Sequence, residues 1–542
     1  MKSLYLSFAA ILTAASLNAQ PFFTQTSYRG AFPVTDNTPA TDWTNGWTNW
    51  DPENTAYGAP TTTVSADITT NTTWSGIISL QNKVYVKNNA ILTIEPGTII
   101  RGDYATQGSL IITKGSKIMA VGTAAQPIVF TSANAVGNRA EGDWGGLVLL
   151  GKAVNNQPSG VANIEGIAPT TDTEFGGSDD NDNSGTLQYV RIEFAGIPLQ
   201  PNKEINGLTF GSVGKATTID HIQVSFSGDD SYEWFGGTVD CKYLIAYRGL
   251  DDDFDTDFGY RGRVQFGLII RDKDMSDAAG DSNAFESDND ATGTGATPQT
   301  APIFSNITIV GPKGDGSIVL PGGEKFEKSF RIRRNSGLSV FNSLSTGWEK
   351  GLSLEGASTE DNFTVNDTAV FGNNILANYA AGSNVVTAAN SIYATFFSAD
   401  NNDSTTTVAQ INWVDVFATL GTTPDARLAN GSTAASGASF TDAKFNGQLV
   451  GLSETQAFNS IQLFPNPVND QATLVLNSEE SQQVQVTLTD ISGKTVAELF
   501  NGMSNSGATS VHWSVNNLQA GLYTLVIRTE NNVSTVKCLI SK

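Results

Sequence analysis

The stretch LTIEPGTIIRG, from Leu92 to Gly102, contains the pattern that decides the fold class of this chain. Two short runs of apolar and β-branched residues flank Pro96-Gly97; such runs favour strands, and a Pro-Gly pair marks a tight turn. Related phrases follow at GSKIMAVGTAAQPIVFTS (Gly115–Ser132) and GDWGGLVLLG (Gly142–Gly151). This part of the sequence therefore predicts short strands joined by tight turns.

Short apolar runs of this kind continue along the chain, at 187–194, 219–226, 264–270, 303–310 and 329–333. Their spacing is often about 18–25 residues, and short strands at such a period are typical of a solenoid whose coils stack on one core. A β-propeller would need a blade of ~40–50 residues with a recurring motif, which the sequence lacks. The sequence predicts an all-β solenoid, with a pair of β-sandwiches as the competing arrangement.

The composition limits the size and the partners of the protein. A chain of 542 residues exceeds what one compact core usually holds, so we expect two or more domains. The formal charge of −23 argues against nucleic-acid binding, because phosphate contacts need Lys and Arg. The two cysteines, Cys241 and Cys538, lie far apart in the sequence and are predicted to be buried and unpaired.

The phrases at 92–102, 115–132 and 142–147 resemble the parallel β-helix domains of exported Bacteroidetes proteins. The later DARL, at Asp425–Leu428, is similar to the last coil of many right-handed β-helix proteins. The resemblance implies a right-handed parallel β-helix at 80–445. Because that fold carries lyases, hydrolases, binders and adhesins alike, it implies an architecture and not an activity.

The end of the chain carries four motifs in order. FPNPVND begins at Phe464, LTDISGK at Leu488, LQAGLYTLVIR at Leu518 and KCLISK at Lys537. This set resembles the type A C-terminal sorting domain of the Bacteroidetes type IX secretion system. The resemblance implies a small Ig-like β-sandwich at 459–542, recognised by the outer-membrane secretion machinery, and a protein that is secreted or displayed on the cell surface.

The N-terminus also predicts export. Lys2 precedes an apolar run and then Asn18-Ala19-Gln20, which describes a secretory signal peptide at 1–19. The run is too short for the ~30 Å core of a bilayer and no later segment approaches that length, so no transmembrane segment is predicted. Residues 446–458, a short polar stretch, are the predicted linker to the sorting domain.

Residues 20–79 precede the predicted coils and are expected to form an N-terminal cap, because an open β-helix end exposes unpaired strand edges. Trp43, Trp47 and Trp50 lie close together in this region. Two interpretations are open. Large aromatics bury much area and would plug the end of the coil, or their indole faces form a ligand-binding site that stacks on sugar rings.

Two acidic loops have the spacing of calcium ligands. DNDNSG at Asp180–Gly185 and DNDATG at Asp288–Gly293 place oxygen-bearing side chains at alternate positions before a Gly, as a loop around calcium requires. Neither has Glu at the twelfth position, so an EF-hand is not predicted. The alternative is a solvated Asp/Asn turn. The candidate calcium ligands are Asp180, Asp182, Ser184, Asp288, Asp290 and Thr292.

The densest acidic run is DDDFDTDF, at Asp251–Phe258. If this run is extended, its alternate carboxylates at 251, 253, 255 and 257 share one face and both Phe side chains point inward. Arginines or calcium must then offset the repulsion. Paired carboxylates suit glycoside hydrolysis, whereas calcium with Arg suits β-elimination from a uronate. The candidate catalytic residues are Asp229, Asp230, Asp253 and Arg261.

Together these observations favour a secreted or cell-surface β-helix protein that binds polysaccharide or acts in adhesion and is stabilised by calcium. The first alternative is a polysaccharide lyase or glycoside hydrolase that uses the acidic region. The second is a structural protein of the surface or the biofilm. A cleft in which carboxylates and a basic side chain converge would favour the enzyme, and exposed aromatics on a flat face would favour the binder.

Overall fold

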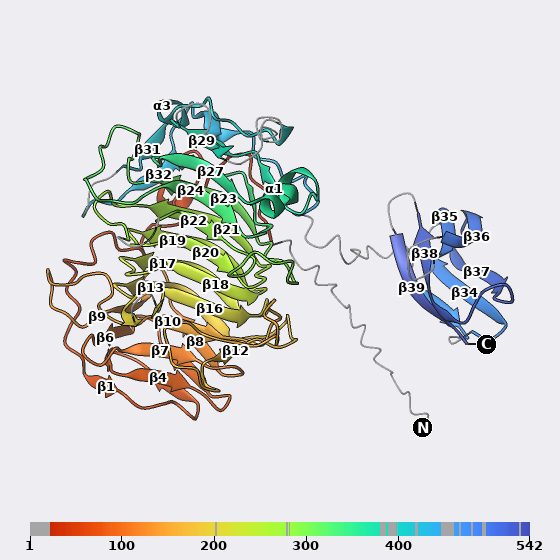
Figure 1. The fold of residues 1–542 in the computed structure, drawn as a ribbon, viewed down its shortest axis with the longest axis horizontal. Coiled ribbons are helices and arrows are strands. Elements are labelled where there is room, and N and C mark those ends of the chain that lie inside the picture. Colours follow the sequence, from red (N-terminus) through yellow and green to blue (C-terminus); the bar gives the residue numbers. More distant parts are fainter. Residues whose placement is uncertain are drawn as a thin grey trace, which may run out of the picture. The chain divides into compact units, whose positions relative to one another are not determined.

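The structure is a computed structural model that describes residues 22–200, 203–277, 280, 282–379, 386–387, 397, 399–417, 421–445, 460–465, 468–478, 481–489, 495–529 and 533–541. The predicted signal peptide (1–19) and linker (446–458) lie outside the described residues. The chain divides into two compact units, one of residues 22–440 and one that contains the C-terminal residues from 441 on (Figure 1). Within the ranges just given, no helix has the length and apolar character to cross a membrane.

The larger unit contains a ten-stranded parallel sheet, called sheet 1 below. Its strands, in spatial order, are β4 (Lys83–Val86), β7 (Ser109–Ile112), β10 (Leu147–Leu150), β16 (Leu208–Val213), β18 (Tyr232–Gly237), β20 (Phe254–Asp257), β22 (Phe285–Ser287), β24 (Lys328–Arg333), β27 (Lys350–Glu355) and β30 (Val386–Thr387). Each strand pairs with the strand of the next coil.

The second sheet of this unit, sheet 2, has sixteen strands and is parallel as well. They are β1 (Thr62–Val64), β2 (Thr72–Trp74), β3 (Ile77–Leu80), β5 (Ile91–Ile94), β6 (Ile99–Gly102), β8 (Lys117–Val121), β9 (Ile128–Ser132), β13 (Gly185–Glu193), β17 (Thr218–Ser225), β19 (Asp240–Tyr247), β21 (Arg263–Ile270), β23 (Ile303–Val310), β25 (Ser339–Phe341), β26 (Leu344–Thr346), β28 (Phe371–Gly372) and β29 (Ile375–Ala377). The predicted parallel β-helix is confirmed (Figure 1).

The long strands of sheet 2 bend in the middle, so that this sheet covers two sides of each coil. The first half of β13 pairs with β8 and its second half with β9. The bends lie at residues with positive φ, among them Tyr189, His221 and Tyr243. The His221 ring stacks between the other two, at 4.4 Å from each ring centroid, and these contacts offset the unfavourable backbone conformation. His221 is therefore part of a structural stack.

The core is a set of inward-facing columns that run from coil to coil. Ile78, Ile100, Phe130, Ile192 and Val224 are successive partners in the register of sheet 2 and are 2% exposed or less. Because each coil buries its apolar side chains against the neighbouring coils, stability comes from the stack as a whole. This is why the short apolar runs of the sequence predicted the architecture.

The coils are less regular than the spacing of apolar runs predicted. Phe130 and Ile192 are neighbours although a long insertion separates them. This insertion contains the hairpin of β11 (Ala162–Asn163) and β12 (Glu174–Phe175), whose apolar residues pack on the outer face of sheet 1 beside Phe235. The insertion therefore adds a wall to that face.

Residues 22–57, called the strap below, run along the side of the β-helix rather than over its end. The Asn49 N–H donates to Gln223 of β17, and the Gly30 N–H donates to the Asn342 carbonyl several coils further on. The first coil begins at β1, ahead of the expected boundary at residue 80. The physical reason is the apolar outer face of sheet 2, which includes Phe226 and Leu268 and needs a cover.

Short elements complete the larger unit. They are η1 (Pro39–Thr41) in the strap, the hairpin of β14 (Pro198–Gln200) and β15 (Lys203–Glu204), α1 (Ala357–Thr364), α3 (Val408–Ile411), the hairpin of β31 (Trp413–Asp415) and β32 (Asp425–Leu428), and η2 (Thr433–Ala435). The strap also reaches this last part, because the Thr35 N–H donates to the Leu428 carbonyl.

The C-terminal unit is the predicted β-sandwich. One antiparallel sheet contains β33 (Ser460–Phe464), β34 (Gln471–Ser478) and β37 (Gly507–Ser514), and the other contains β36 (Thr495–Met503), β35 (Gln483–Thr489), β38 (Gly521–Arg528) and β39 (Val533–Ile540). Apolar residues of both sheets share one core. Cys538 lies in this core and Cys241 in the β-helix, and both thiols are unpaired, as predicted.

Candidate functional site

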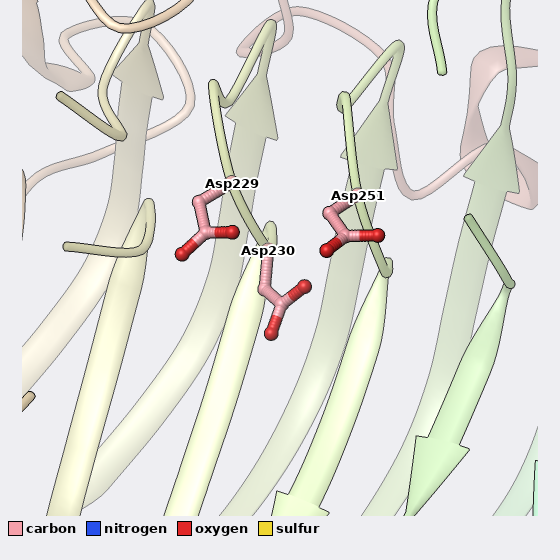
Figure 2. A group of neighbouring side chains, drawn as sticks. All are labelled: Asp229, Asp230 and Asp251. Atoms are coloured by element: carbon pink, nitrogen blue, oxygen red, sulfur yellow. The ribbon is translucent and has the colours of Figure 1, made fainter. Parts of the chain in front are cut away.

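The acidic residues gather at the turns that lead into sheet 1. Asp229 and Asp230 lie in the turn before β18, and Asp251 and Asp252 lie in the turn before β20. Figure 2 shows Asp229 and Asp230 on one turn and Asp251 on the neighbouring turn, with the three carboxyl groups close together. The coils stack, so equivalent turns bring like charges side by side.

Hydrogen bonds between the turns fix these carboxylates in place. Asp230 Oδ1 accepts the backbone N–H of Asp252 at 2.8 Å. Asp252 Oδ1 in turn accepts the backbone N–H and the side-chain amide of Asn283, at 2.5 and 3.0 Å. Each of these two carboxylates therefore caps the turn of the next coil, which gives the acidic group a fixed geometry.

A second row of charge lies on the outer face of sheet 1. Glu233, Asp255, Glu286 and Arg331 are successive partners in the register of β18, β20, β22 and β24. Three acids are thus placed on adjacent strands before the first basic residue, and like charges in such positions are destabilising unless something offsets them.

The two rows meet in three overlapping groups whose carboxylate oxygens lie within 4.8 Å of one another. The groups are Asp229, Asp230 and Asp251; Asp230, Glu233 and Asp255; and Asp252, Asp255 and Glu286. Asp230 and Asp255 each belong to two groups and so join the three into one cluster. We call these seven residues the acidic cluster.

Burial and mutual repulsion change the protonation of this cluster. Burial, first, and then neighbouring carboxylates raise the pKa of Asp230, Asp252 and Asp255 well above the ordinary carboxyl value. The same two causes raise the pKa of Glu233. Removing these groups from water disfavours their charged form, so the cluster favours either protons or a cation.

Five residues of the cluster line an open cleft of about 540 Å³, namely Asp229, Asp230, Glu233, Asp251 and Asp255. Its other lining residues include Glu165, Asn206, Leu250 and Asp277. A smaller hollow of about 240 Å³ adjoins it and is lined by Asp230, Asp252, Asp255, Glu286 and the arginines Arg331 and Arg333, among others. The site is therefore a cleft that is acidic over most of its length and has basic side chains at one end.

Two buried oxygens in the cleft have no hydrogen-bond donor. They are Oδ1 of Asp255 and Oδ1 of Asn206, whose Nδ2 donates to Glu233. Calcium takes six to eight oxygen ligands, from carboxylates and amides among others. The acidic cluster with Asn206 supplies oxygens of these kinds at short range, so the residues present fit a hard divalent cation.

The arginines at the basic end are held by acids. Arg331 contacts Glu286 at 3.1 Å and Glu355 at 3.3 Å, and Arg333 contacts Asp288 at 2.8 Å as well as Glu286. Glu286 is thus shared between the acidic cluster and the arginines. This arrangement fixes the positive end of the cleft next to its negative part.

Of the four candidate catalytic residues, Asp229 and Asp230 lie in the cleft. Asp253 does not, because its side chain is fully buried in the β-helix and pairs with Arg271 at 3.2 Å. Burial, partly offset by Arg271, raises the pKa of Asp253 to about 7. Arg261 is not a lining residue of the cleft and contacts Asp180 at 2.9 Å instead.

The expected alternation along 251–258 holds only within β20. Phe254 points inward, and Asp255 and Asp257 lie on the outer face. Asp253 lies before the strand begins, where the chain is still turning, and this is why it faces the interior. Phe258 lies after the strand and is partly exposed.

The first predicted calcium loop is occupied by protein donors. Asp180 accepts from the Val154 N–H and from Arg261, and Asp182 accepts from the Lys152 N–H. The Ser184 hydroxyl donates to Asp182, although at 3.5 Å this contact is long. None of the three carboxylate groups found among the described residues includes this loop.

The second predicted loop is satisfied in the same way. Asp288 is paired with Arg333 and with Arg334, the latter at 2.6 Å. Asp290 accepts from the N–H groups of Thr292 and Thr294 and so caps its own turn. The carboxylates that lie within reach of one another are therefore in other turns than the two loops with the predicted calcium spacing.

The three tryptophans do not form a surface for sugars. Trp47 and Trp50 are 1% and 5% exposed, and they pack on the outer face of sheet 2 against Tyr189 and Tyr247. Trp43 is half-buried and stacks on Phe32 of the strap. The interpretation as buried aromatics is confirmed, but they anchor the strap along the side of the β-helix rather than plug its end.

Several members of the site were not candidates from the sequence. Glu233, Asp255 and Asn206 reach the cleft, and Asp252 and Glu286 reach the adjoining hollow, only because the coils stack in this register. The density of acid along 251–257 was the signal for Asp252 and Asp255. Glu233 and Glu286 are isolated acids in apolar strands, and a charged residue at a position expected to be buried is the signal that could have identified them.

Among curated proteins, none matches this chain. One solved structure that is similar is the full-length tailspike protein 2 (TSP2, ORF211) of the Escherichia coli O157:H7 bacteriophage CAB120, at 10% sequence identity and a TM-score of 0.22. The match covers 86% of this chain and 64% of the tailspike, so the chain spans less than two thirds of that protein's length.

Two families match the chain in the order that the structure shows. Residues 462–542 match the secretion system C-terminal sorting domain, which implies interaction with the type IX secretion machinery and secretion or display on the cell surface. Residues 63–418 match the pectate-lyase-like β-helix domain, from the first coil to the last strands of the larger unit. The chain therefore belongs to the family of the pectate-lyase-like β-helix domain and is a secreted or cell-surface protein with a C-terminal sorting domain.

Proposed function

We propose that the acidic cleft binds calcium and, through it, an extracellular polysaccharide. The observation that carries this proposal is the acidic cluster itself, with Asp230 and Asp255 shared between carboxylate groups and a buried Asp255 oxygen that lacks a donor. Seven carboxylates at this distance repel one another, and a divalent cation offsets that repulsion while satisfying the oxygens.

A cation in an open cleft also provides a means of binding a polymer. Calcium bound near the surface keeps positions for outside oxygens, including the carboxylates and hydroxyls of a sugar chain. An acidic polysaccharide would otherwise be repelled by the cleft. Its binding should therefore depend on calcium and weaken at low pH, because protons compete for the same carboxylates.

Cleavage of the polymer is the second candidate, and the contact between acids and arginines favours it. Arg331 and Arg333 line the hollow that continues from Asp230 and Asp255. A carboxyl group with a raised pKa, such as Glu233, is suited to donate a proton to a leaving oxygen, while an ionised neighbour or a bound cation stabilises the charge of the transition state. The arginines would hold the acidic groups of the chain.

Calcium titration of the mature full-length protein tests the proposal. We expect saturable calcium binding by calorimetry and calcium-dependent retardation in native gels that contain an acidic polysaccharide. Asp230→Asn and Asp255→Asn should each weaken calcium binding at least about tenfold, because both residues join two carboxylate groups. The matched control is Asp67→Asn, which changes an exposed acid of the first coils.

The outcomes separate the candidates. Retardation with the polymer intact supports binding alone, and new chain ends in the polymer show cleavage. Equal calcium affinity in the wild-type protein and both cleft variants would refute the assignment of the cation to this cleft.

A further inference from the structure

A hollow of about 330 Å³ with both aromatic and polar lining lies next to the acidic cleft and has no part in the function proposed above. It is lined by residues 163–169 of the insertion, by Phe235 of β18 and by Phe258, which directly follows β20. Glu165 lines both this hollow and the acidic cleft. The two spaces are therefore adjacent, with Glu165 between them.

Two Phe side chains form the floor of this hollow, mainly Phe258, which is half-buried, whereas Phe235 is 5% exposed. The ring centroids of Phe235 and Phe258 are 5.1 Å apart, and Phe175 stacks on the other side of Phe235 at 6.0 Å. The Phe258 backbone is fixed on both sides, since its N–H donates to Asp257 and its carbonyl accepts from Asn156. The floor is thus formed before any ligand binds.

The insertion provides the wall. Ile164 and Ile167 are buried against the outer face of sheet 1, and the Ile164 N–H donates to the Thr173 carbonyl at 3.0 Å. Asn163 and Glu165 are exposed at the rim. The hollow therefore combines an apolar floor with polar groups at its edge.

We propose that this hollow is a subsite for an uncharged sugar residue of the polymer that the acidic cleft binds. The inference rests on the function proposed above. The apolar C–H face of a pyranose packs on an aromatic floor, and its hydroxyls find hydrogen-bond partners in the amide and the carboxylate at the rim. A carboxylated sugar is disfavoured, because the Glu165 carboxylate at the rim repels its charge.

The position of the subsite defines a class of polymer. Because the hollow and the cleft adjoin at Glu165, neighbouring units of one chain occupy them together. The polymer that fits both carries an acidic unit next to an uncharged unit with a large apolar face, such as a 6-deoxyhexose. A homopolymer of uronic acid can fill only the cleft.

Two variants of the full-length protein remove the subsite without touching the acidic cluster. Ala168→Trp places a large side chain in the hollow from an exposed position, and Phe258→Asn removes part of the floor at a backbone φ of 52° that Asn tolerates. Thr171→Trp, at an exposed position of the same loop, is the matched control. The probes are rhamnogalacturonan, which alternates uronic acid and 6-deoxyhexose, and polygalacturonate, each titrated by calorimetry in calcium.

The wild-type protein and the control should bind the alternating polymer about tenfold more tightly than the homopolymer, and both subsite variants should lose this preference. Their calcium affinity should stay unchanged. A wild-type protein without the preference, or an Ala168→Trp protein that keeps it, would overturn the subsite. Failure of the underlying function is distinguishable, because calcium would then not bind or neither polymer would be bound.

Discussion

On two outer faces of the same β-helix, side chains of the same kind lie above one another from coil to coil. On sheet 2, the rings of Tyr189 and His221 lie one above the other, and the strap covers them with Trp47. On sheet 1, Glu233 and Asp255 occupy neighbouring positions in the register, and they line an open cleft. Stacked rings attract one another, whereas stacked carboxylates repel. A stack that stabilises the fold can be closed by the chain itself, whereas a stack that destabilises it remains open to a ligand, which under the function proposed above is a cation.

Substitution of two acids that are almost adjacent in the sequence, Asp253 and Asp255, should distinguish a structural charge from a repelled one. Asp253→Ala should destabilise the protein by about 4 kcal/mol, because it leaves the Arg271 charge buried without its partner. Asp255→Ala should not destabilise the calcium-free protein, since it removes a repelled charge from the acidic cluster. Urea unfolding in EDTA measures both free energies. Equal losses would mean that Asp255 is as structural as Asp253.

The next prediction concerns the outer face of sheet 2, which the strap covers. Trp47→Ala should lower the free energy of unfolding by about 3 kcal/mol, because it removes a side chain that is 1% exposed and packs against Tyr189 and His221. Calcium affinity should not change, since the strap makes no part of the cleft. Thermal unfolding and a calcium titration of the same sample test both statements. Trp43→Ala, at a half-buried position, serves as the milder comparison.

The last prediction concerns the pH dependence of stability, which should come from the acidic cluster on sheet 1. Carboxyls whose pKa is raised in the folded chain, such as Asp230 and Asp255, hold their protons more tightly there than in the unfolded chain. Their contribution to stability is complete below the ordinary carboxyl value near ~4 and is lost as the pH rises through the raised value. In EDTA, the Tm should therefore fall from pH 5 to pH 8, on the order of 2 °C for each 1 kcal/mol lost.

Excess calcium should remove this part of the pH dependence, because the bound cation takes the place of the protons. Asp255→Asn should have a smaller decrease in EDTA than the wild-type protein. A Tm difference between pH 5 and pH 8 that neither calcium nor Asp255→Asn alters would show that the acidic cluster is not its source.

The architecture could be predicted from short-range patterns, but most of the site could not. Apolar runs such as 92–102 indicate strands by themselves, and stacking follows from their repetition. Asp229 and Asp230 could be proposed from the sequence because they are adjacent acids. Glu233 and Glu286 join them only through the register of the coils, and insertions of unequal length hide that register from the sequence.

Three interpretations of the sequence differ from the structure, each for a physical reason. The Asp180 loop has the spacing of calcium ligands, but spacing does not reveal that Arg261 and backbone N–H groups already occupy its oxygens. The alternation that placed Asp253 on the outer face assumed that the strand begins earlier than it does. The tryptophans of the strap would be buried whether they covered the end or the side of the β-helix. They cover the side because the outer face of sheet 2 is apolar, and this is visible only in the structure.

The path of the strap determines when, during synthesis, the protein can finish folding. The Arg29 N–H donates to the Ala434 carbonyl, and Gly30 lies under Leu344, so the first described residues are completed by some of the last ones of the β-helix. On the ribosome the strap is synthesised first and these partners last. Contacts between such distant parts of a chain form slowly, and the apolar side of the strap stays uncovered until they do. A chain with this path cannot complete its fold until nearly all of the β-helix has been synthesised.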